Sequence, residues 1–156
     1  MKKNKNYLAI DLGTTMGWAV KKGDTQKIYS GTVSFKEKTR LCGAGLRFYE
    51  FRNWLDLVIS RLDGLECVYS EAVVAHSATQ AAQIYGGFAA TLQVWCADNE
   101  VPLKGFPVGT IKKNFTGRGN ANKKDMMAEA VRRGYNPSTD NAADAIAILC
   151  TANVAE

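Results

Sequence analysis

Residues 7–20 read Tyr-Leu-Ala-Ile-Asp-Leu-Gly-Thr-Thr-Met-Gly-Trp-Ala-Val and decide how the fold begins. Two apolar runs, 7–10 and 17–20, flank the turn that starts at Asp11. The next segment, 28–35, alternates in polarity and is rich in residues that favour strands. The sequence therefore predicts three consecutive antiparallel strands, with Asp11 at the end of the first.

The rest of the chain alternates helical and strand-like segments. Short apolar runs predict strands at 65–70 and 101–106, and the glycine-containing stretch 107–122 is expected to be a loop. Helical spacing or helix-favouring composition predicts helices over 44–62, 77–98, 123–133 and 139–152. This order of elements predicts a mixed sheet flanked by helices, in the α/β class.

Composition is that of one globular domain spanning residues 1–156. Hydrophobic residues make up 46% and charged residues 22% of the chain. One histidine, His76, argues against a histidine-rich zinc site or a Ser-His-Asp triad. The sequence shows no membrane segment and no export signal, and the cysteines form no Cys-x-x-Cys, so we expect reduced thiols and a cytoplasmic location. The cysteines are Cys42, Cys67, Cys96 and Cys150.

Four carboxylates stand where chemistry is expected in an α/β sheet. Asp11 and Glu71 each follow an apolar strand, while Asp140 and Asp144 share one face at the start of the last helix. Convergent carboxylates suit Mg²⁺ or Mn²⁺, and a pair of such ions activates water against a phosphodiester. The alternatives are structural: Asp140 caps its helix, or Asp11 caps its turn.

Positive charge is concentrated in residues 104–133. The chain carries a net charge of +5, whereas this segment, with eight basic and two acidic residues, carries +6. Gly117 and Gly119 would let backbone N–H groups approach phosphates, and the basic side chains would supply salt-dependent affinity. The alternative is an ordinary solvated surface.

The chain resembles the RuvC-type Holliday-junction resolvases, especially their phage-type branch. The similarity rests on residues 10–18, on the strand ending at Glu71, on residues 110–123 and on residues 140–148. It implies a ribonuclease-H-like five-stranded sheet, with three antiparallel strands followed by two parallel ones. It also implies a homodimer and Mg²⁺-dependent nicking of four-way DNA junctions.

The resemblance assigns a role to individual residues. Asp11, Glu71 and Asp144 match the catalytic acids, with Asp140 as a fourth metal ligand, and they would hold Mg²⁺ (or Mn²⁺), two ions per site. Lys112 and Lys123 match basic positions near the scissile phosphate. The expected DNA-binding residues are Lys112, Lys113, Arg118, Lys123 and Lys124.

Two positions depart from the bacterial pattern. An acid is expected three residues before Asp144, where this chain has Asn141, so Asp140 is the expected substitute. An aromatic wedge is expected where the chain has Val74, and Tyr85 and Phe88 are candidate replacements.

The resemblance also bears on the paired glycines of the helix over 77–98. Gly86 and Gly87 lie in its middle, at a cost of about 1 kcal/mol each relative to alanine. Packing of this helix on the sheet is one explanation. The explanation that the resemblance implies is an interface between two protomers, where small residues let two helices approach closely.

Two other functions compete with junction resolution. The Asp11–Thr15 turn also looks like the first phosphate loop of actin/hexokinase-type ATPases, but 156 residues do not hold the second domain of those proteins, so no nucleotide cofactor is expected. A related ribonuclease-H-like protein that processes structured RNA, or that merely binds branched DNA, is the other alternative.

Overall fold

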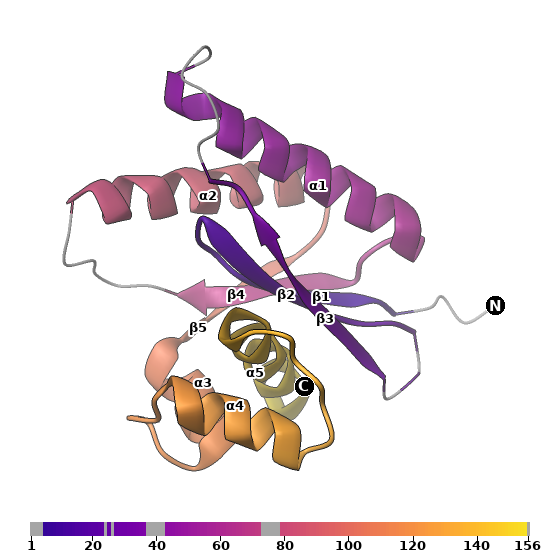
Figure 1. Ribbon diagram of the computed structural model, residues 1–156. Coiled ribbons are helices and arrows are strands. Elements are labelled where there is room, and N and C mark those ends of the chain that lie inside the picture. The colour runs from indigo at the N-terminus through magenta and orange to yellow at the C-terminus, as the bar shows by residue number, and fades with distance from the viewer. Residues whose placement is uncertain (1–4, 24, 26, 37–42, 73–78, 156) are drawn as a thin grey trace.

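The computed structural model describes residues 5–23, 25, 27–36, 43–72 and 79–155. Its centre is a five-stranded sheet with the strand order β3-β2-β1-β4-β5 (Figure 1). The first three strands pair in antiparallel fashion, and β4 and β5 continue the sheet in parallel with β1. The strands are β1 (Tyr7–Asp11), β2 (Thr15–Lys21), β3 (Ile28–Ser34), β4 (Cys67–Ala72) and β5 (Leu103–Pro107). The predicted mixed sheet is confirmed.

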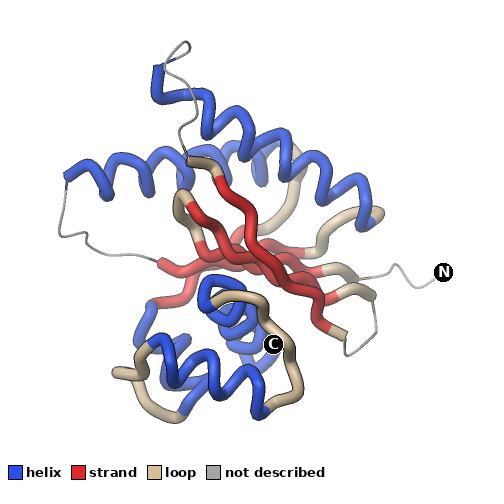
Figure 2. The backbone as a smooth tube through the Cα atoms, in the orientation of Figure 1, coloured by secondary structure: helices blue, strands red, loops and turns tan. Residues whose placement is uncertain are grey.

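Helices cover both faces of this sheet (Figure 2). One face is covered by α1 (Leu46–Leu62), which a short 3₁₀ turn (Gly43–Gly45) precedes, and by α2 (Thr79–Asp98). The other face is covered by α5 (Asp140–Ala155), against which α3 (Val108–Thr116) and α4 (Lys123–Arg132) pack. None of the described helices is long and apolar enough to cross a lipid bilayer.

Strand alternation divides the interior into two cores. In β1, Leu8 and Ile10 face α1 and α2, whereas Ala9 between them faces α5. The core beneath α1 and α2 is aromatic and includes Phe51 and Phe88, whose ring centroids lie 5.5 Å apart. The core around α5 is lined by alanines, which let this helix lie close to the strands. Because α5 lies so close, its first turn comes near the end of β1.

The stretch predicted as a loop after the last strand instead forms α3. Its buried residues Ile111 and Phe115 are four positions apart, which is helical spacing. Gly109 before them, and the lysines and asparagine between them, obscure this period in the sequence. The helix ends at Gly117, whose φ of 85° places it in the left-handed region that favours glycine. The element order is otherwise as predicted.

The paired glycines of α2 have different surroundings. A Cβ atom on Gly87 would lie 2.2 Å from the ring of Phe48, so this glycine serves the packing of α1 on α2 within one chain. A Cβ atom on Gly86 would meet nothing within 4 Å. Gly87 therefore packs within the chain, but against α1 and not against the sheet as predicted, and of the pair Gly86 faces outward.

Candidate active site

The four predicted carboxylates come together on the face of the sheet that α5 covers. Asp11 ends β1, and Glu71 lies near the end of β4, which pairs in parallel with β1. Ala9 and Tyr69, two residues earlier in each strand, both belong to the core around α5. Since side chains alternate along a strand, Asp11 and Glu71 point to that same face. We call Asp11, Glu71, Asp140 and Asp144 the acidic cluster.

Burial and mutual repulsion raise the pKa values of two members of the cluster. Desolvation raises the pKa of Asp11 to about 7, with added repulsion from Asp144, Glu71 and Asp140. Desolvation also raises the pKa of Asp144 to about 6, with repulsion from Asp140 and Glu71. Lys123 opposes both shifts. These couplings place acids from β1, β4 and α5 within electrostatic range of one another.

Asp140 is not the residue that caps α5. The hydroxyl of Thr139 accepts a hydrogen bond from the N–H of Ala142 at 3.1 Å, which is the role of an N-cap side chain. The carboxylate of Asp140 accepts a hydrogen bond from the N–H of Asn141 at 3.0 Å and forms an ion pair with Lys123 at 3.3 Å. Asp140 thus binds one N–H of the first turn, but the N-cap position belongs to Thr139. Thr139 is not among the predicted site residues, although a threonine directly before a helical Asp is an N-cap signal.

The two predicted lysines border the acidic cluster from α3 and α4. Lys112 lines a small cavity of about 50 Å³ together with Glu71 and Asp144, and its charge favours the ionised form of Asp144. Lys123 is the first residue of α4 and forms the ion pair with Asp140, and its side chain is 80% exposed. Both cations therefore lie next to the carboxylates.

The remaining basic residues predicted to bind DNA are exposed on α3, α4 and the loop between them. Lys113 and Lys124 are exposed, and Arg118 forms an ion pair with Asp125 at 3.0 Å. Asp125 also completes a capping box with Asn122 at the start of α4. The charge of Arg118 is thus partly neutralised, which leaves the two lysines as the freer cations of this surface.

The donor set of the acidic cluster fits a hard divalent cation. Carboxylate oxygens are the ligands that Mg²⁺ and Mn²⁺ prefer, and a cation would offset the repulsion that raises these pKa values. Among the described residues, no three acid, histidine or cysteine side chains are already arranged as a coordination group. The chemistry of the residues fits such an ion, and its binding would require small movements of the carboxylates.

The aromatic candidates for a junction wedge have structural positions. Phe88 is fully buried between α1 and α2 and is excluded. Tyr85 is half-buried, and its hydroxyl donates to the backbone carbonyl of Glu71 at 3.0 Å. Tyr85 therefore fixes the end of β4 that carries an acid of the cluster. Val74 and His76 lie outside the described residues.

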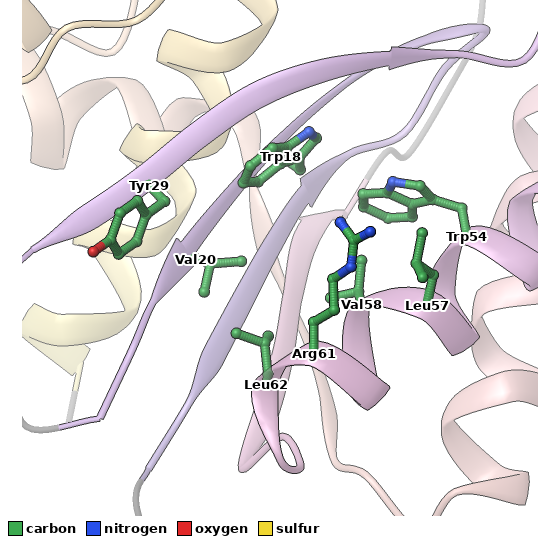
Figure 3. A pocket seen from close by; sticks show the side chains of 8 residues that line it. All are labelled: Trp18, Val20, Tyr29, Trp54, Leu57, Val58, Arg61 and Leu62. Atoms are coloured by element: carbon green, nitrogen blue, oxygen red, sulfur yellow. The ribbon is translucent and has the colours of Figure 1, made fainter.

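A larger, apolar pocket of about 300 Å³ lies on the other face of the sheet (Figure 3). Trp18 and Val20 of β2 form its floor, and both belong to the core beneath α1 and α2. Trp54 and Arg61 of α1 border it. Because Asp11 points to the opposite face, this pocket is separate from the acidic cluster.

The architecture is similar to that of solved junction resolvases. Thermus thermophilus RuvC in complex with a Holliday junction substrate matches with a TM-score of 0.79 at 21% sequence identity, over 94% of this chain and 92% of that chain. The chain has a RuvC-like fold. A second T. thermophilus RuvC structure matches with a TM-score of 0.74 at 22% identity, over the same shares of the two chains. The yeast mitochondrial Holliday junction resolvase Ydc2 matches with a TM-score of 0.65 at 12% identity, over 95% of this chain and 77% of that chain.

No protein-family model matches the chain. The structural matches confirm the predicted ribonuclease-H-like fold, similar to that of RuvC, and the narrower phage-type branch stays a prediction. Roles of single residues do not follow from identities this low, so they are proposed below from the geometry.

Proposed function

We propose that the protein is a Mg²⁺-dependent endonuclease that resolves four-way DNA junctions by nicking paired strands. The observation that carries the proposal is the acidic cluster with Lys112 and Lys123 beside it, on a fold similar to that of a RuvC solved with a Holliday junction. Several half-buried carboxylates close together destabilise the folded protein unless cations offset their charge. The acidic cluster therefore has no stabilising role that would explain it.

The acids and the lysines of the site are proposed to have different roles in phosphodiester hydrolysis. Asp11, Glu71, Asp140 and Asp144 would hold one or two Mg²⁺ ions, with Mn²⁺ as a substitute. When bound, these ions activate a water and stabilise the leaving oxygen. Lys112, which lines a small cavity together with Glu71 and Asp144, is proposed to neutralise negative charge that develops on the phosphate.

Lys123 has a second task, because it is the ion-pair partner of Asp140. A cation and a metal compete for the same carboxylate. An ion held by the acidic cluster would compete with Lys123 for Asp140, and the exposed side chain of Lys123 would then be free to turn toward the DNA. Lys123 is therefore proposed to lie near the scissile phosphate and to stabilise negative charge that develops on it.

Affinity for DNA is proposed to come from the basic surface of α3 and α4. Lys113, Lys124 and, less strongly, Arg118 contact phosphates without reading sequence. Recognition then depends on the shape of the junction. Binding is expected to weaken steeply with salt, and linear duplex is expected to compete poorly.

The protein is proposed to act as a homodimer in the cytoplasm of its cell. A four-way junction has two-fold symmetry, and one acidic cluster per chain cuts both strands only if two copies pair. The exposed face of α2 around Gly86, Ala90 and Val94 is the proposed seam. Gly86→Leu should yield monomers by light scattering, and wild-type protein that is monomeric yet fully resolves junctions at low concentration would contradict the dimer.

The deciding experiment compares three substrates with and without Mg²⁺. A synthetic four-way junction, a linear duplex of matched sequence and a structured RNA are incubated with the protein, and products are resolved on denaturing gels. Paired nicks in the junction alone, lost in EDTA, are expected. Cleavage of the RNA but not of the junction would favour the ribonuclease-H-like alternative.

A matched variant separates catalysis from binding. Asp144→Asn keeps the size of the side chain and removes one proposed metal ligand. We expect it to bind the junction like the wild type and to nick it at least about 100-fold more slowly. Near-wild-type nicking by this variant would remove Asp144 from the site. Asp140→Asn and Asn141→Asp, measured beside it, test whether Asp140 supplies the fourth acid.

A further inference from the structure

The first turn of α5 rests on a row of three residues that runs across the sheet. In the strand register, Asp11 of β1 pairs with Gly17 of β2, and Gly17 pairs with Thr32 of β3. Paired residues point to the same face of a sheet, so all three face α5. The acidic cluster lies at one end of this row.

At Gly17 the backbone of the sheet lies very close to the backbone of α5. A Cβ atom at this position would lie 1.9 Å from the carbonyl oxygen of Asn141 and 2.3 Å from its carbonyl carbon. The obstructing atoms belong to the helix backbone, so no side chain can rotate out of the way. Restoring an ordinary contact of 3.4 Å would move the start of α5 outward by about 1.5 Å.

Thr32, at the other end of the row, ties the same turn in place. Its hydroxyl shares a hydrogen bond of 2.7 Å with the hydroxyl of Thr139, the residue that caps α5. This bond joins β3 to the start of α5 across 107 positions of sequence. The first turn of α5 is thus fixed at two neighbouring points, by the close approach of its backbone to Gly17 and by the hydrogen bond from Thr139 to Thr32.

We propose that Gly17 and Thr32 are positioning residues that set the distance from Asp140 and Asp144 to Asp11. The two acids of α5 lie on either side of the Asn141 carbonyl in the chain, so an outward shift of that carbonyl carries both away from β1. Neither Gly17 nor Thr32 contributes a ligand or touches DNA in this proposal. The role rests on the proposed function only in that the acidic cluster binds a divalent metal.

The test is Mn²⁺ binding to the purified full chain, measured by electron paramagnetic resonance of the free ion, without DNA. Residues that support metal ligands change affinity by about 10–100-fold when altered. Gly17→Ala should weaken Mn²⁺ binding by at least about 10-fold, and Thr32→Val, which removes only a hydroxyl contact, by about fivefold. Gly45→Ala adds the same methyl group where nothing lies within 4 Å and should bind Mn²⁺ like the wild type.

Thermal unfolding of each variant separates positioning from general loss of fold. The measurements are made well below the melting temperature of every variant. If Gly17→Ala does not fold, the Mn²⁺ affinity of Thr32→Val tests the positioning role instead. The proposal also expects excess Mn²⁺ to restore the cleavage rate of Thr32→Val at saturating junction, which a merely destabilised protein would not show.

Each outcome separates this proposal from the proposed function. If Gly17→Ala folds and binds Mn²⁺ as tightly as the unaltered chain does, the positioning role is overturned. If Gly17→Ala does not fold, the same result for Thr32→Val overturns it. Neither result bears on whether the protein cuts junctions. Weakened Mn²⁺ binding in the variants of a protein that never cuts junctions upholds the positioning role and overturns the proposed substrate. No Mn²⁺ binding by the unaltered chain overturns the metal site and the positioning role together.

Discussion

Replacing Asp11 with asparagine should stabilise the metal-free protein at neutral and alkaline pH while abolishing cleavage. The pKa of Asp11 is raised from 3.8 to about 7, mainly because the carboxyl is desolvated and next because Asp144 repels it. A folded protein that holds this proton more tightly than the unfolded chain loses stability as the pH rises from about 4 to 7. Asparagine carries no charge and escapes that loss.

The size of the effect follows from the shift. Each pKa unit corresponds to about 1.4 kcal/mol, so holding the ionised form of Asp11 costs about 4 kcal/mol at pH 8. Asparagine is itself polar and retains part of the desolvation penalty. We therefore expect a gain of about 2–4 kcal/mol, which for a domain of this size raises the melting temperature by about 5–10 °C.

The assay is thermal unfolding of both proteins by circular dichroism in EDTA, from pH 5 to pH 8.5. The difference in melting temperature should widen up to about pH 7 and stay constant above it. Millimolar Mg²⁺ should close the gap, because ligand binding stabilises the wild type and not the variant.

Glu129→Gln provides a control of opposite sign. Hydrogen bonds from Arg132 and Arg133 lower the pKa of Glu129 to about 2. Its contribution to stability is therefore present above about pH 4.5 and is lost as the pH falls toward 2. This variant should be less stable than the wild type at pH 8. An Asp11→Asn protein no more stable than the wild type at pH 8 in EDTA would refute the electrostatic account of the acidic cluster.

Three further predictions follow from the same structure. Mn²⁺ affinity measured by calorimetry should rise about tenfold per pH unit between pH 6 and 7 and level off by pH 8, because Asp11 and Asp144, with pKa values of about 7 and about 6, must release protons to bind metal; an affinity that does not change from pH 5.5 to 8 would contradict this. Lys112→Ala and Lys123→Ala should each lower the single-turnover cleavage rate at saturating junction, about 10-fold or more, through lost charge stabilisation; a change confined to the dissociation constant would reassign them to backbone contacts. Gly87→Leu should lower the melting temperature by several degrees because its side chain would overlap the ring of Phe48, whereas Gly45→Ala, in open space and outside the proposed seam, should not; equal melting temperatures would show that the packing of α1 on α2 tolerates the added atoms.

The sequence alone determined the elements that carry the site. The apolar run of β1 stops at Asp11, and that of β4 stops before Glu71, so alternation and length were enough to place both acids at strand ends. The alanines that follow Asp140 have small side chains, which let α5 lie close to the sheet. These features are local, because an apolar pattern over five to fifteen residues fixes whether a segment is a strand or a helix.

Local patterns failed where polar residues interrupted the helical period. Residues 108–116 were expected to be a loop, because their glycine and lysines conceal the spacing of Ile111 and Phe115. The helix forms because α5 offers those two side chains an apolar surface. Burial against another part of the chain thus overrides weak local preference.

The geometry of the site was decided only by tertiary structure. No pattern in the sequence shows that the carbonyl of Asn141 rests on Gly17, or that Thr139 bonds to Thr32, since both depend on strand register and on contacts between residues more than 100 positions apart. The raised pKa of Asp11 likewise arises from burial and from charges contributed by β4 and α5. Short-range preference fixes what each segment is, but the distance between segments, and with it the chemistry of their side chains, is set by packing.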